Sequence, residues 1–226
     1  MEFTNGKWTT MELKERPDAV EKCKLHLQEK ARQAREAEHR QAWKRLCPPE
    51  YCNTRSEQLP NVQKFEEVQK WQYGPKGLLL IGPTRRGKTR SAWKLLERLH
   101  FEERRKILAF TPMDLKLAVA SAWRDSINVM SHEALSRCDE MEEEEWIWQV
   151  RRIDVLFLDD LDTIKFTEAV EETIYDIFEY RPTHGYPVIA TVNRTGRELV
   201  ARMNANGRGA KIVERIREYC QVINFT

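Results

Sequence analysis

A glycine-rich segment with one lysine carries the clearest chemical signal in this sequence. It fits the pattern G-x-x-x-x-G-K-[ST], which is typical of loops that bind nucleotide phosphates. In such a loop, backbone N–H groups point at the phosphates, the lysine faces the β and γ phosphates, and the hydroxyl after it can bind Mg²⁺. The segment therefore predicts a nucleotide site made of Gly82, Pro83, Thr84, Arg85, Arg86, Gly87, Lys88 and Thr89.

The surroundings of this segment agree with that prediction. Residues 77–81 are an apolar run of buried-strand length, and residues 90–100 have apolar side chains at helical spacing. One feature is unusual, because Arg85 and Arg86 stand where many such loops have a glycine and a small residue. The backbone there must either avoid positive φ or accept strain, and the two arginines could gain contacts to phosphate or to a nearby acid.

Two adjacent acids follow the apolar run at residues 153–158. A carboxylate at the tip of a strand next to the phosphate loop can bind Mg²⁺, and a second can orient or deprotonate the attacking water. We assign Asp159 to the metal and Asp160 to the water, with Asn193, after the next predicted strand, as a hydrogen-bond partner of the γ-phosphate or of that water. The alternative is that the acids only cap a helix or stabilise a loop.

These side chains require a scaffold that brings strand ends together. Strands and helices alternate after residue 60, which predicts an α/β domain with a parallel sheet and right-handed crossovers. The expected strands are 77–81, 106–110, 153–158, 187–192 and 220–225, and the expected helices are 62–71, 90–100, 113–124, 131–150, 167–180, 195–203 and 208–219. The acidic run 139–145 is interpreted as a solvated helix face.

The N-terminal part has a different character. Residues 1–16 are interpreted as a loose leader, and a long charged helix is expected from Pro17 to about Leu46, where two prolines end it. Its narrow stripe could pack on its own domain, form a coiled coil or dock on a partner, and consists of Val20, Cys23, Leu27, Ala31 and Ala34. We predict a helical partner-binding segment at 1–46 and an ATPase domain at 47–226. The strip 46–51, with its prolines and Tyr51, could form a wall for the adenine ring or simply pack.

Composition limits the classes of function. The formal net charge of +2 over 226 residues does not by itself indicate nucleic-acid binding. Five cysteines, with no segment of membrane-spanning length, predict a reducing cytoplasmic setting and no membrane partner. A zinc site from Cys23, His26, Cys47 and Cys52 is disfavoured, because the last two are not spaced as a usual ligand pair.

The order and rough spacing of four motifs resemble those of AAA+ ATPases. They are 82–89, the acid pair, ATVN at 190–193 and IVERI at 212–216. Residues 46–226 look like the DnaC-type replicative helicase loaders and the related insertion-sequence transposition ATPases. The resemblance implies a P-loop NTPase of AAA+ type, a three-layer αβα sheet without a C-terminal lid, preceded by the N-terminal helical segment. It also implies that the acids are the Walker B element, that Asn193 is sensor 1 and that Arg215 is the arginine finger of a neighbouring subunit. An ordinary salt bridge of Arg215 with Glu214 or Glu218 is the alternative.

The resemblance implies a loader that binds ATP and Mg²⁺, hydrolyses ATP slowly with stimulation by DNA, and binds single-stranded DNA and a replicative helicase. It would assemble as a homo-oligomer or with a related ATPase. The alternatives are a transposition-associated ATPase, a P-loop small-molecule kinase and an adaptor that binds ATP but hardly hydrolyses it. DNA contacts are expected from a basic stretch with few acids, although a solvated helix face explains it equally well: Arg194, Arg197, Arg202, Arg208 and Lys211.

Overall fold

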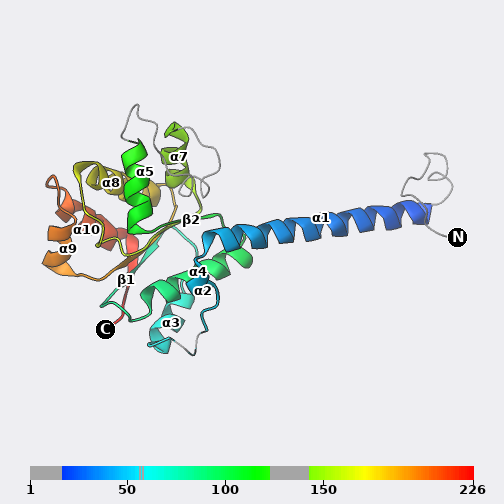
Figure 1. Ribbon diagram of the computed structural model, residues 1–226, viewed down its shortest axis with the longest axis horizontal. Coiled ribbons are helices and arrows are strands. Elements are labelled where there is room, and N and C mark those ends of the chain that lie inside the picture. The colour runs from blue at the N-terminus through cyan, green and yellow to red at the C-terminus, as the bar shows by residue number, and fades with distance from the viewer. Residues whose placement is uncertain (1–16, 56, 58, 123–142) are drawn as a thin grey trace. The chain divides into compact units, whose positions relative to one another are not determined.

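The computed structural model describes residues 17–55, 57, 59–122 and 143–226. The chain divides into two compact units, Met1–Trp43 and Lys44–Thr226, whose elements are labelled in Figure 1. The leader expected at 1–16, the beginning of the helix expected at 131–150 and most of the acidic run lie outside the described residues.

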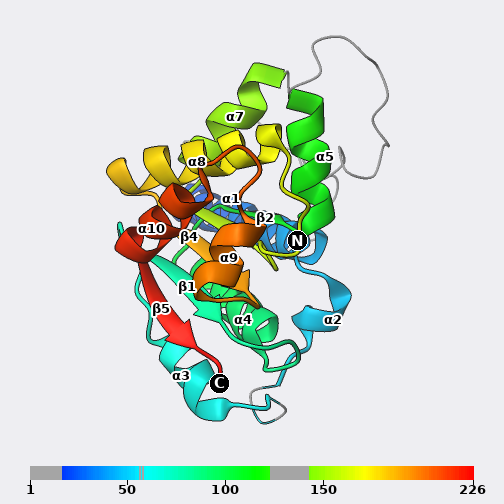
Figure 2. The same ribbon diagram turned by 90° about the vertical axis from the view of Figure 1, so that its left-hand side faces the viewer.

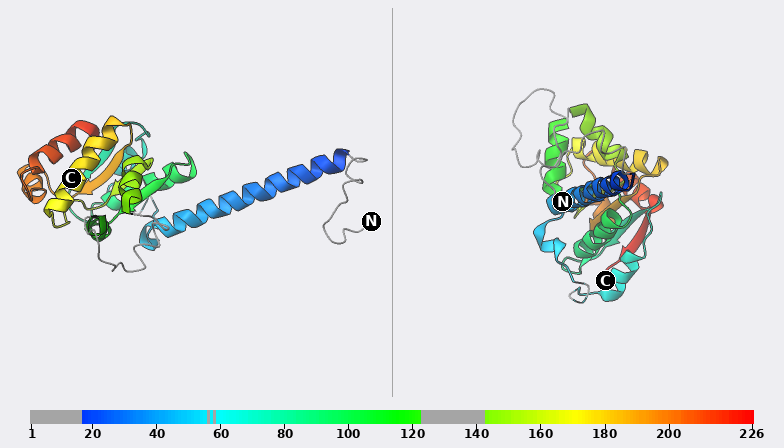
Figure 3. Two further views of the ribbon diagram at one scale, coloured as in Figure 1. Left: turned by 90° about the horizontal axis from the view of Figure 1, so that it is seen from above. Right: turned by 90° about the vertical axis from the view of Figure 1, so that its right-hand side faces the viewer.

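Helix α1, Pro17–Leu46, is one continuous helix of 30 residues, which Figure 3 shows from two directions. It ends directly before Cys47 and Pro48, where the prolines were predicted to end it. Four members of the predicted stripe, Cys23, Leu27, Ala31 and Ala34, are exposed, and the side chain of the fifth lies outside the described residues. The role of this stripe as a docking or coiled-coil surface therefore stays a prediction.

The second unit alternates strands and helices, as the hydrophobic pattern predicted. Its strands are β1 (Gly77–Ile81), β2 (Ile107–Phe110), β3 (Val155–Leu158), β4 (Val188–Val192) and β5 (Cys220–Asn224). Its helices are α2 (Pro49–Cys52), α3 (Val62–Gln69), α4 (Lys88–Phe101), α5 (Pro112–Ala122), α7 (Glu143–Arg152), α8 (Glu168–Thr183), α9 (Gly196–Arg202) and α10 (Gly209–Tyr219).

The five strands form one parallel sheet in the order β2-β3-β4-β1-β5. Strand β4 lies between β3 and β1, pairing Ala190 with both Leu158 and Leu79. The predicted α/β class is thus confirmed. Because parallel strands end at the same edge, the residues that follow β1, β3 and β4 are brought together there.

Helices cover the sheet on both faces, with α3 and α4 on one side and α8 and α10 on the other (Figure 2). The burial pattern explains this arrangement, since neighbouring residues of a strand point to opposite faces. Leu156 and Leu158 belong to the core shared with α8 and α10, whereas the intervening Phe157 makes an edge contact with Trp93 of α4. A strand buried on both faces reads as a continuous apolar run, which is what the sequence shows at 155–158.

One local element was not predicted. A short helix, α2, begins at Pro49, within the segment that the sequence analysis treated as a connection. Proline is tolerated at the first position of a helix, because its missing N–H would have no intrahelical partner there. The prolines therefore end α1 and also begin α2, which places Tyr51 beside α4.

Candidate nucleotide-binding site

The predicted phosphate loop joins β1 to α4, the strand–loop–helix context that the sequence indicated. Gly82 has φ of 149°, and a Cβ atom there would lie 2.6 Å from the carbonyl oxygen of Phe225. Gly87 has φ of 90° and caps α4, where a Cβ atom would lie 3.2 Å from Cδ of Pro60. Any side chain at either position would strain the backbone, so the loop geometry requires both glycines.

Arg85 adopts the left-handed conformation, with φ of 63°. Of the two outcomes considered for this position, the backbone therefore accepts strain, at a cost of about 1 to 2 kcal/mol for a residue with a Cβ atom. Arg85 and Arg86 are both exposed, and within the described residues neither has a hydrogen bond or an ion pair. The contact with a nearby acid that was considered for these two arginines is therefore not formed among the described residues.

Lys88 lies almost fully buried at the start of α4, with 4% of its surface exposed. Its Nζ atom donates to the carbonyl oxygens of Gly82 at 2.7 Å and Pro83 at 2.9 Å, and to Oδ1 of Asn193 at 2.9 Å. Burial lowers the pKa of Lys88, while the carboxylates of Asp160, Asp162 and Asp159 oppose that shift. The ammonium group is therefore held by three neutral oxygens, at the place where the motif predicts phosphate.

Asp159 directly follows β3 and faces Thr89 across the site. Its Oδ1 atom accepts hydrogen bonds from Oγ1 of Thr89 at 3.0 Å and from Oγ1 of Thr191 at 2.7 Å. Burial raises the pKa of Asp159, the hydrogen bond from Thr191 opposes this, and the charge of Asp160 adds to it. The two residues assigned to the metal from sequence thus lie side by side.

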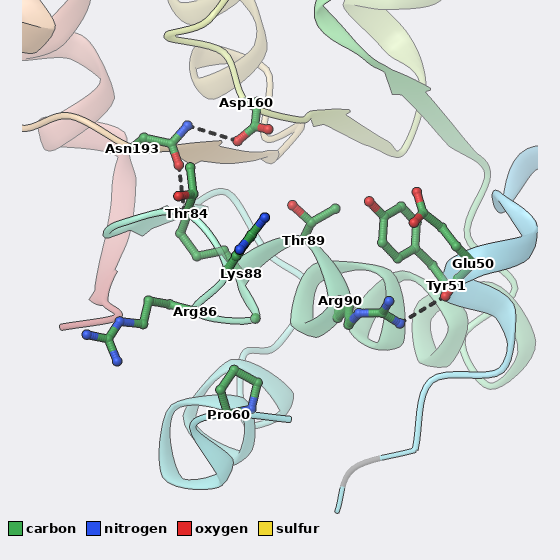
Figure 4. Close-up of a pocket in the computed structure, with 12 residues that line it drawn as sticks. Glu50, Tyr51, Pro60, Thr84, Arg86, Lys88, Thr89, Arg90, Asp160 and Asn193 are labelled. Carbon is green, nitrogen blue, oxygen red and sulfur yellow. Dashed lines mark hydrogen bonds between the residues drawn. The ribbon is translucent and has the colours of Figure 1, made fainter. Parts of the chain in front are cut away.

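Asp160 has φ of 44°, an uncommon backbone conformation for a residue other than glycine. Its N–H donates to Oγ1 of Thr191 at 2.7 Å, and its Oδ1 atom accepts from Nδ2 of Asn193 at 3.1 Å. Strain of this kind persists only where surrounding contacts impose it, and it is concentrated at functional sites. The carboxylate of Asp160 is thereby turned toward the phosphate loop (Figure 4).

A cavity of about 340 Å³ opens between the phosphate loop and Asp160, whereas Asp159 does not line it. Figure 4 shows the side chains of Lys88, Thr89, Asp160 and Asn193 around it. The cavity is lined by Glu50, Tyr51, Pro60, Thr84, Arg85, Arg86, Gly87, Lys88, Thr89, Arg90, Asp160 and Asn193. Most of the predicted nucleotide-binding residues therefore border one space.

Tyr51 of the strip 46–51 is among the residues that line this cavity, whereas Pro48 and Pro49 are not. Its ring stacks on Trp93, with centroids 6.1 Å apart and planes inclined by 12°. The guanidinium of Arg90 lies 5.5 Å from the same ring and donates to the carbonyl oxygen of Glu50 at 2.9 Å. Tyr51 is thus a fixed aromatic wall of the cavity.

Arg215 lies on α10 and is not among the residues that line the cavity. Its guanidinium pairs with Glu179 of α8 at 2.8 Å and with Glu218 at 3.2 Å. Of the two acids considered from sequence, Glu218 is therefore a partner, while Glu179 was not foreseen because it comes from another helix. Within one chain Arg215 makes surface ion pairs, so a role as arginine finger would need a second subunit.

The basic residues considered for DNA binding fall into two groups. Arg194, Arg202 and Arg208 have partners inside the chain, with Arg194 paired to Asp162 at 3.0 Å and Arg208 to Glu172 at 3.2 Å. Arg202 donates to the carbonyl oxygens of the loop after the acid pair. Arg197 and Lys211 are exposed and, within the described residues, make no hydrogen bond or ion pair.

Two residues of the site were missed by the sequence analysis. Thr191 binds both acids, and Asp162 is fully buried beside Asn193. A signal for each existed, because Thr191 is a polar residue inside an apolar strand and Asp162 is a third acid in the run DDLD. Neither could be placed without knowing that β4 lies next to β3.

The described residues contain no group of three or more metal-ligating side chains. Cys23, Cys47, Cys52 and Cys220 are free thiols, and Cys52 Sγ donates to the carbonyl oxygen of Cys47 at 3.3 Å. Among the described helices, none has the length and apolar character to cross a membrane.

Comparison with known proteins finds similarity to solved structures only. No family model matches the sequence, and no curated protein matches it. Among solved structures, DnaI superimposes with a TM-score of 0.57 and 21% identity, covering 80% of this chain and 92% of that one. The DnaC helicase loader gives a TM-score of 0.56 and 19% identity, covering 79% and 100%.

The replication initiator DnaA, in a structure bound to AMPPCP and single-stranded DNA, gives a TM-score of 0.53 and 14% identity. That match covers 78% of this chain and 50% of the DnaA chain, so this chain spans about half the length of DnaA. The three similarities show that the chain has the AAA+ fold of the helicase loaders, which the resemblance of its motifs implied.

Proposed function

We propose that this chain, which shares the AAA+ fold of DnaC and DnaI, is a Mg²⁺-dependent ATPase that loads a replicative helicase during DNA replication. The observation that carries the proposal is the convergence of Lys88, Thr89, Asp159, Asp160 and Asn193 at one end of the sheet. The DnaA structure of the same fold holds AMPPCP and single-stranded DNA, which supports a nucleotide and DNA as ligands.

Mg²⁺ fits the side chains that face each other beside the cavity. The hydroxyl of Thr89 and the carboxylate of Asp159 present two hard oxygen donors 3.0 Å apart. Mg²⁺ usually keeps several waters and binds through one or two side chains plus substrate phosphates, so it does not need a cage of protein ligands. When bound, the ion would neutralise charge between the β and γ phosphates.

The remaining residues can act on the phosphates and on water. Lys88 can exchange its carbonyl partners for β and γ phosphate oxygens, because Nζ lies at the loop that must hold them. Asp160 can orient the attacking water or accept its proton, and Asn193 can hydrogen-bond the γ-phosphate or that water. Arg215 would reach the γ-phosphate of a neighbouring copy, which makes assembly part of the proposal.

The proposed partners are single-stranded DNA, a replicative helicase and further copies of this chain or of a related ATPase. The exposed Arg197 and Lys211 are candidates for DNA backbone contacts, and the residues already paired inside the chain would have to exchange partners to contribute. Helicase binding is assigned to segment 1–46, because every nucleotide motif lies after this segment.

ATP turnover with and without single-stranded DNA tests this function. We expect slow hydrolysis that DNA stimulates, and a fall of about 100-fold in Asp160→Asn with ATP binding retained, since the base is removed while the shape is kept. Strong stimulation by a small metabolite instead of DNA would favour a small-molecule kinase. ATP binding with turnover equal in parent and variant would remove the hydrolytic role from Asp160.

A further inference from the structure

Asp162 is a buried acid that the proposed chemistry does not use. It is 0% exposed and lies in the loop after β3, two residues beyond Asp160. Its Oδ1 atom accepts from the backbone N of Asn193 at 2.9 Å and from Nδ2 of the same residue at 3.4 Å. Its Oδ2 atom accepts from the backbone N of Arg194 at 3.1 Å and from Nη1 of that residue at 3.0 Å.

All four donors to this carboxylate come from two consecutive residues after β4. A buried carboxylate is costly unless its oxygens are well paired, and here each oxygen has two donors. The loop that carries Asp162 is also held from outside, because Arg202 Nε donates to the carbonyl oxygen of Asp162 at 2.9 Å. The Asp162 side chain thus binds the first two residues after β4 to the acid loop, in addition to the bonds that Thr191 makes with Asp159 and Asp160.

The amide of Asn193 lies between a cation and two acids. Its Oδ1 atom faces Nζ of Lys88, and its Nδ2 atom faces Oδ1 of Asp160 and Oδ1 of Asp162. Turning the amide over would set an NH₂ group against an ammonium and a carbonyl oxygen against two carboxylates. Only one orientation satisfies all three neighbours, and Asp162 also fixes the backbone from which the amide projects.

We infer that Asp162 is a positioning residue that holds the Asn193 amide with its oxygen toward Lys88 and its nitrogen toward Asp160. The consequence for ATP hydrolysis rests on the proposed function, whereas the orientation of the amide does not. A purely structural acid would stabilise the loop without affecting turnover through Asn193, so the two roles predict different kinetics.

A double-mutant cycle with Asn193→Ala separates these roles. Asp162→Asn places one NH₂ group against existing donors, and we expect kcat to fall about 10-fold or more with the ATP affinity changed by less than about 3-fold. In the Asn193→Ala background the same change should alter kcat by less than about 2-fold, because the residue it acts through is gone. An equal loss of kcat in both backgrounds would overturn the inference.

Glu171→Gln is the matched control. Glu171 is also 0% exposed and holds another loop by accepting from the backbone N atoms of Asn206 and Arg208. Losing a contact of this buried acid should lower Tm while leaving kcat unchanged. If Asp162→Asn does not fold, Arg194→Met provides a milder change, because its side chain is 43% exposed. We expect it to lower kcat about 3-fold, again only when Asn193 is present.

The side-chain amide of Asn193 can be observed directly by NMR in nucleotide-free protein labelled with ¹⁵N-asparagine. Its resonances should shift and lose protection from exchange in Asp162→Asn or Arg194→Met, and should stay unchanged in Glu171→Gln. Unchanged resonances in Asp162→Asn, or in Arg194→Met if the former does not fold, would overturn the inference. If the resonances shift but the parent hydrolyses no ATP, the proposed function fails and the positioning role stands.

Discussion

At the scale of single residues, the site is held together by bonds that a nucleotide would have to replace. Nζ of Lys88 has three oxygen partners within 2.9 Å, two of them in its own loop. Asp159 is satisfied by two hydroxyl groups. Binding of ATP and Mg²⁺ must therefore exchange internal hydrogen bonds for phosphate and metal contacts.

Lys88→Ala tests whether the ammonium group of Lys88 exchanges its oxygen partners for phosphate. We expect ATP affinity to fall by about 100-fold or more, because charge-assisted bonds to two phosphates are lost. Lys94→Ala on the same helix is the control, since Lys94 pairs with Glu97 and does not line the cavity. Calorimetric titration with ATP measures both, and tight binding in the Lys88 variant would contradict a role for this lysine in phosphate binding.

Asp159→Asn tests the carboxylate of Asp159, first through the pH dependence of the protein's stability and then through binding of ATP with Mg²⁺. Burial raises the pKa of Asp159, so the folded state binds this proton more tightly than the unfolded state. A raised carboxyl pKa costs stability at higher pH, and the cost shrinks as the pH falls below the raised value until it is gone below the pKa of the unfolded chain. We therefore expect the variant to have a higher Tm than the parent at about pH 7.5, with the gap shrinking as the solution becomes acidic.

Thermal unfolding of parent and variant at about pH 7.5 and at more acidic pH values measures the difference in Tm. The same measurement with ATP and Mg²⁺ added tests ligand binding. The ligand should stabilise the parent and not the variant, because the proposed metal ligand has been removed. A gap that stays constant on acidification would show that the buried carboxylate is not the cause.

At the scale of elements, the phosphate loop has a geometry that its sequence only partly favours. Gly82 and Gly87 occupy positions with positive φ, and so does Arg85. Asp160, in the opposite loop, does the same. The two loops that face the cavity thus both contain strained residues, held by the strands and helices that flank them.

Arg85→Gly should relieve this strain, whereas Arg86→Gly should only increase the entropy of the unfolded chain. We expect the first variant to be more stable than the second by about 1 to 2 kcal/mol, because only Arg85 has positive φ. Chemical denaturation without nucleotide measures the difference. Equal stability of the two variants would mean that the left-handed conformation at Arg85 costs nothing.

At the scale of the whole molecule, the chain divides into two compact units, and the α/β unit begins at Lys44. The proposed function divides its tasks in the same way, with nucleotide chemistry in the second unit. It also requires a second copy, since Arg215 faces Glu179 and Glu218 and lines no part of the cavity in its own chain.

A chain that begins near Leu46 should keep ATP binding and lose association with the replicative helicase. The physical reason is that all residues lining the cavity lie beyond this point, while the exposed stripe of α1 lies before it. Pull-down with purified helicase and titration with ATP test the two halves. Helicase binding by the shortened chain would place the docking surface on the α/β unit.

Arg215→Ala tests assembly. We expect unchanged ATP affinity in the isolated chain, loss of turnover, and partial recovery when the variant is mixed with Asp160→Asn, since each supplies the half-site that the other lacks. Arg217→Ala, an exposed arginine of the same helix, is the control and should retain turnover. If both variants assemble and no mixing ratio restores activity, Arg215 is only a surface ion-pair residue.

The sequence alone determined the fold class and the strand–loop–helix setting of the predicted phosphate loop. Continuous apolar runs predict strands buried on both faces, and a glycine-rich turn between such a strand and a helix predicts a phosphate loop, although the backbone at Arg85 stayed open. These features depend on residues close together in the chain, so their pattern could be interpreted without a structure. The end of α1 at the two prolines is local in the same sense.

Contacts between distant segments were decided only by the tertiary structure. The position of β4 between β3 and β1 sets Asn193 between Lys88 and Asp160 and brings Thr191 to both acids. The same neighbourhood buries Asp162 against the end of β4, and the packing of α10 on α8 gives Arg215 the partner Glu179. No periodicity reports which strand lies beside which, because the hydrophobic pattern of a buried strand is the same whatever its neighbours are.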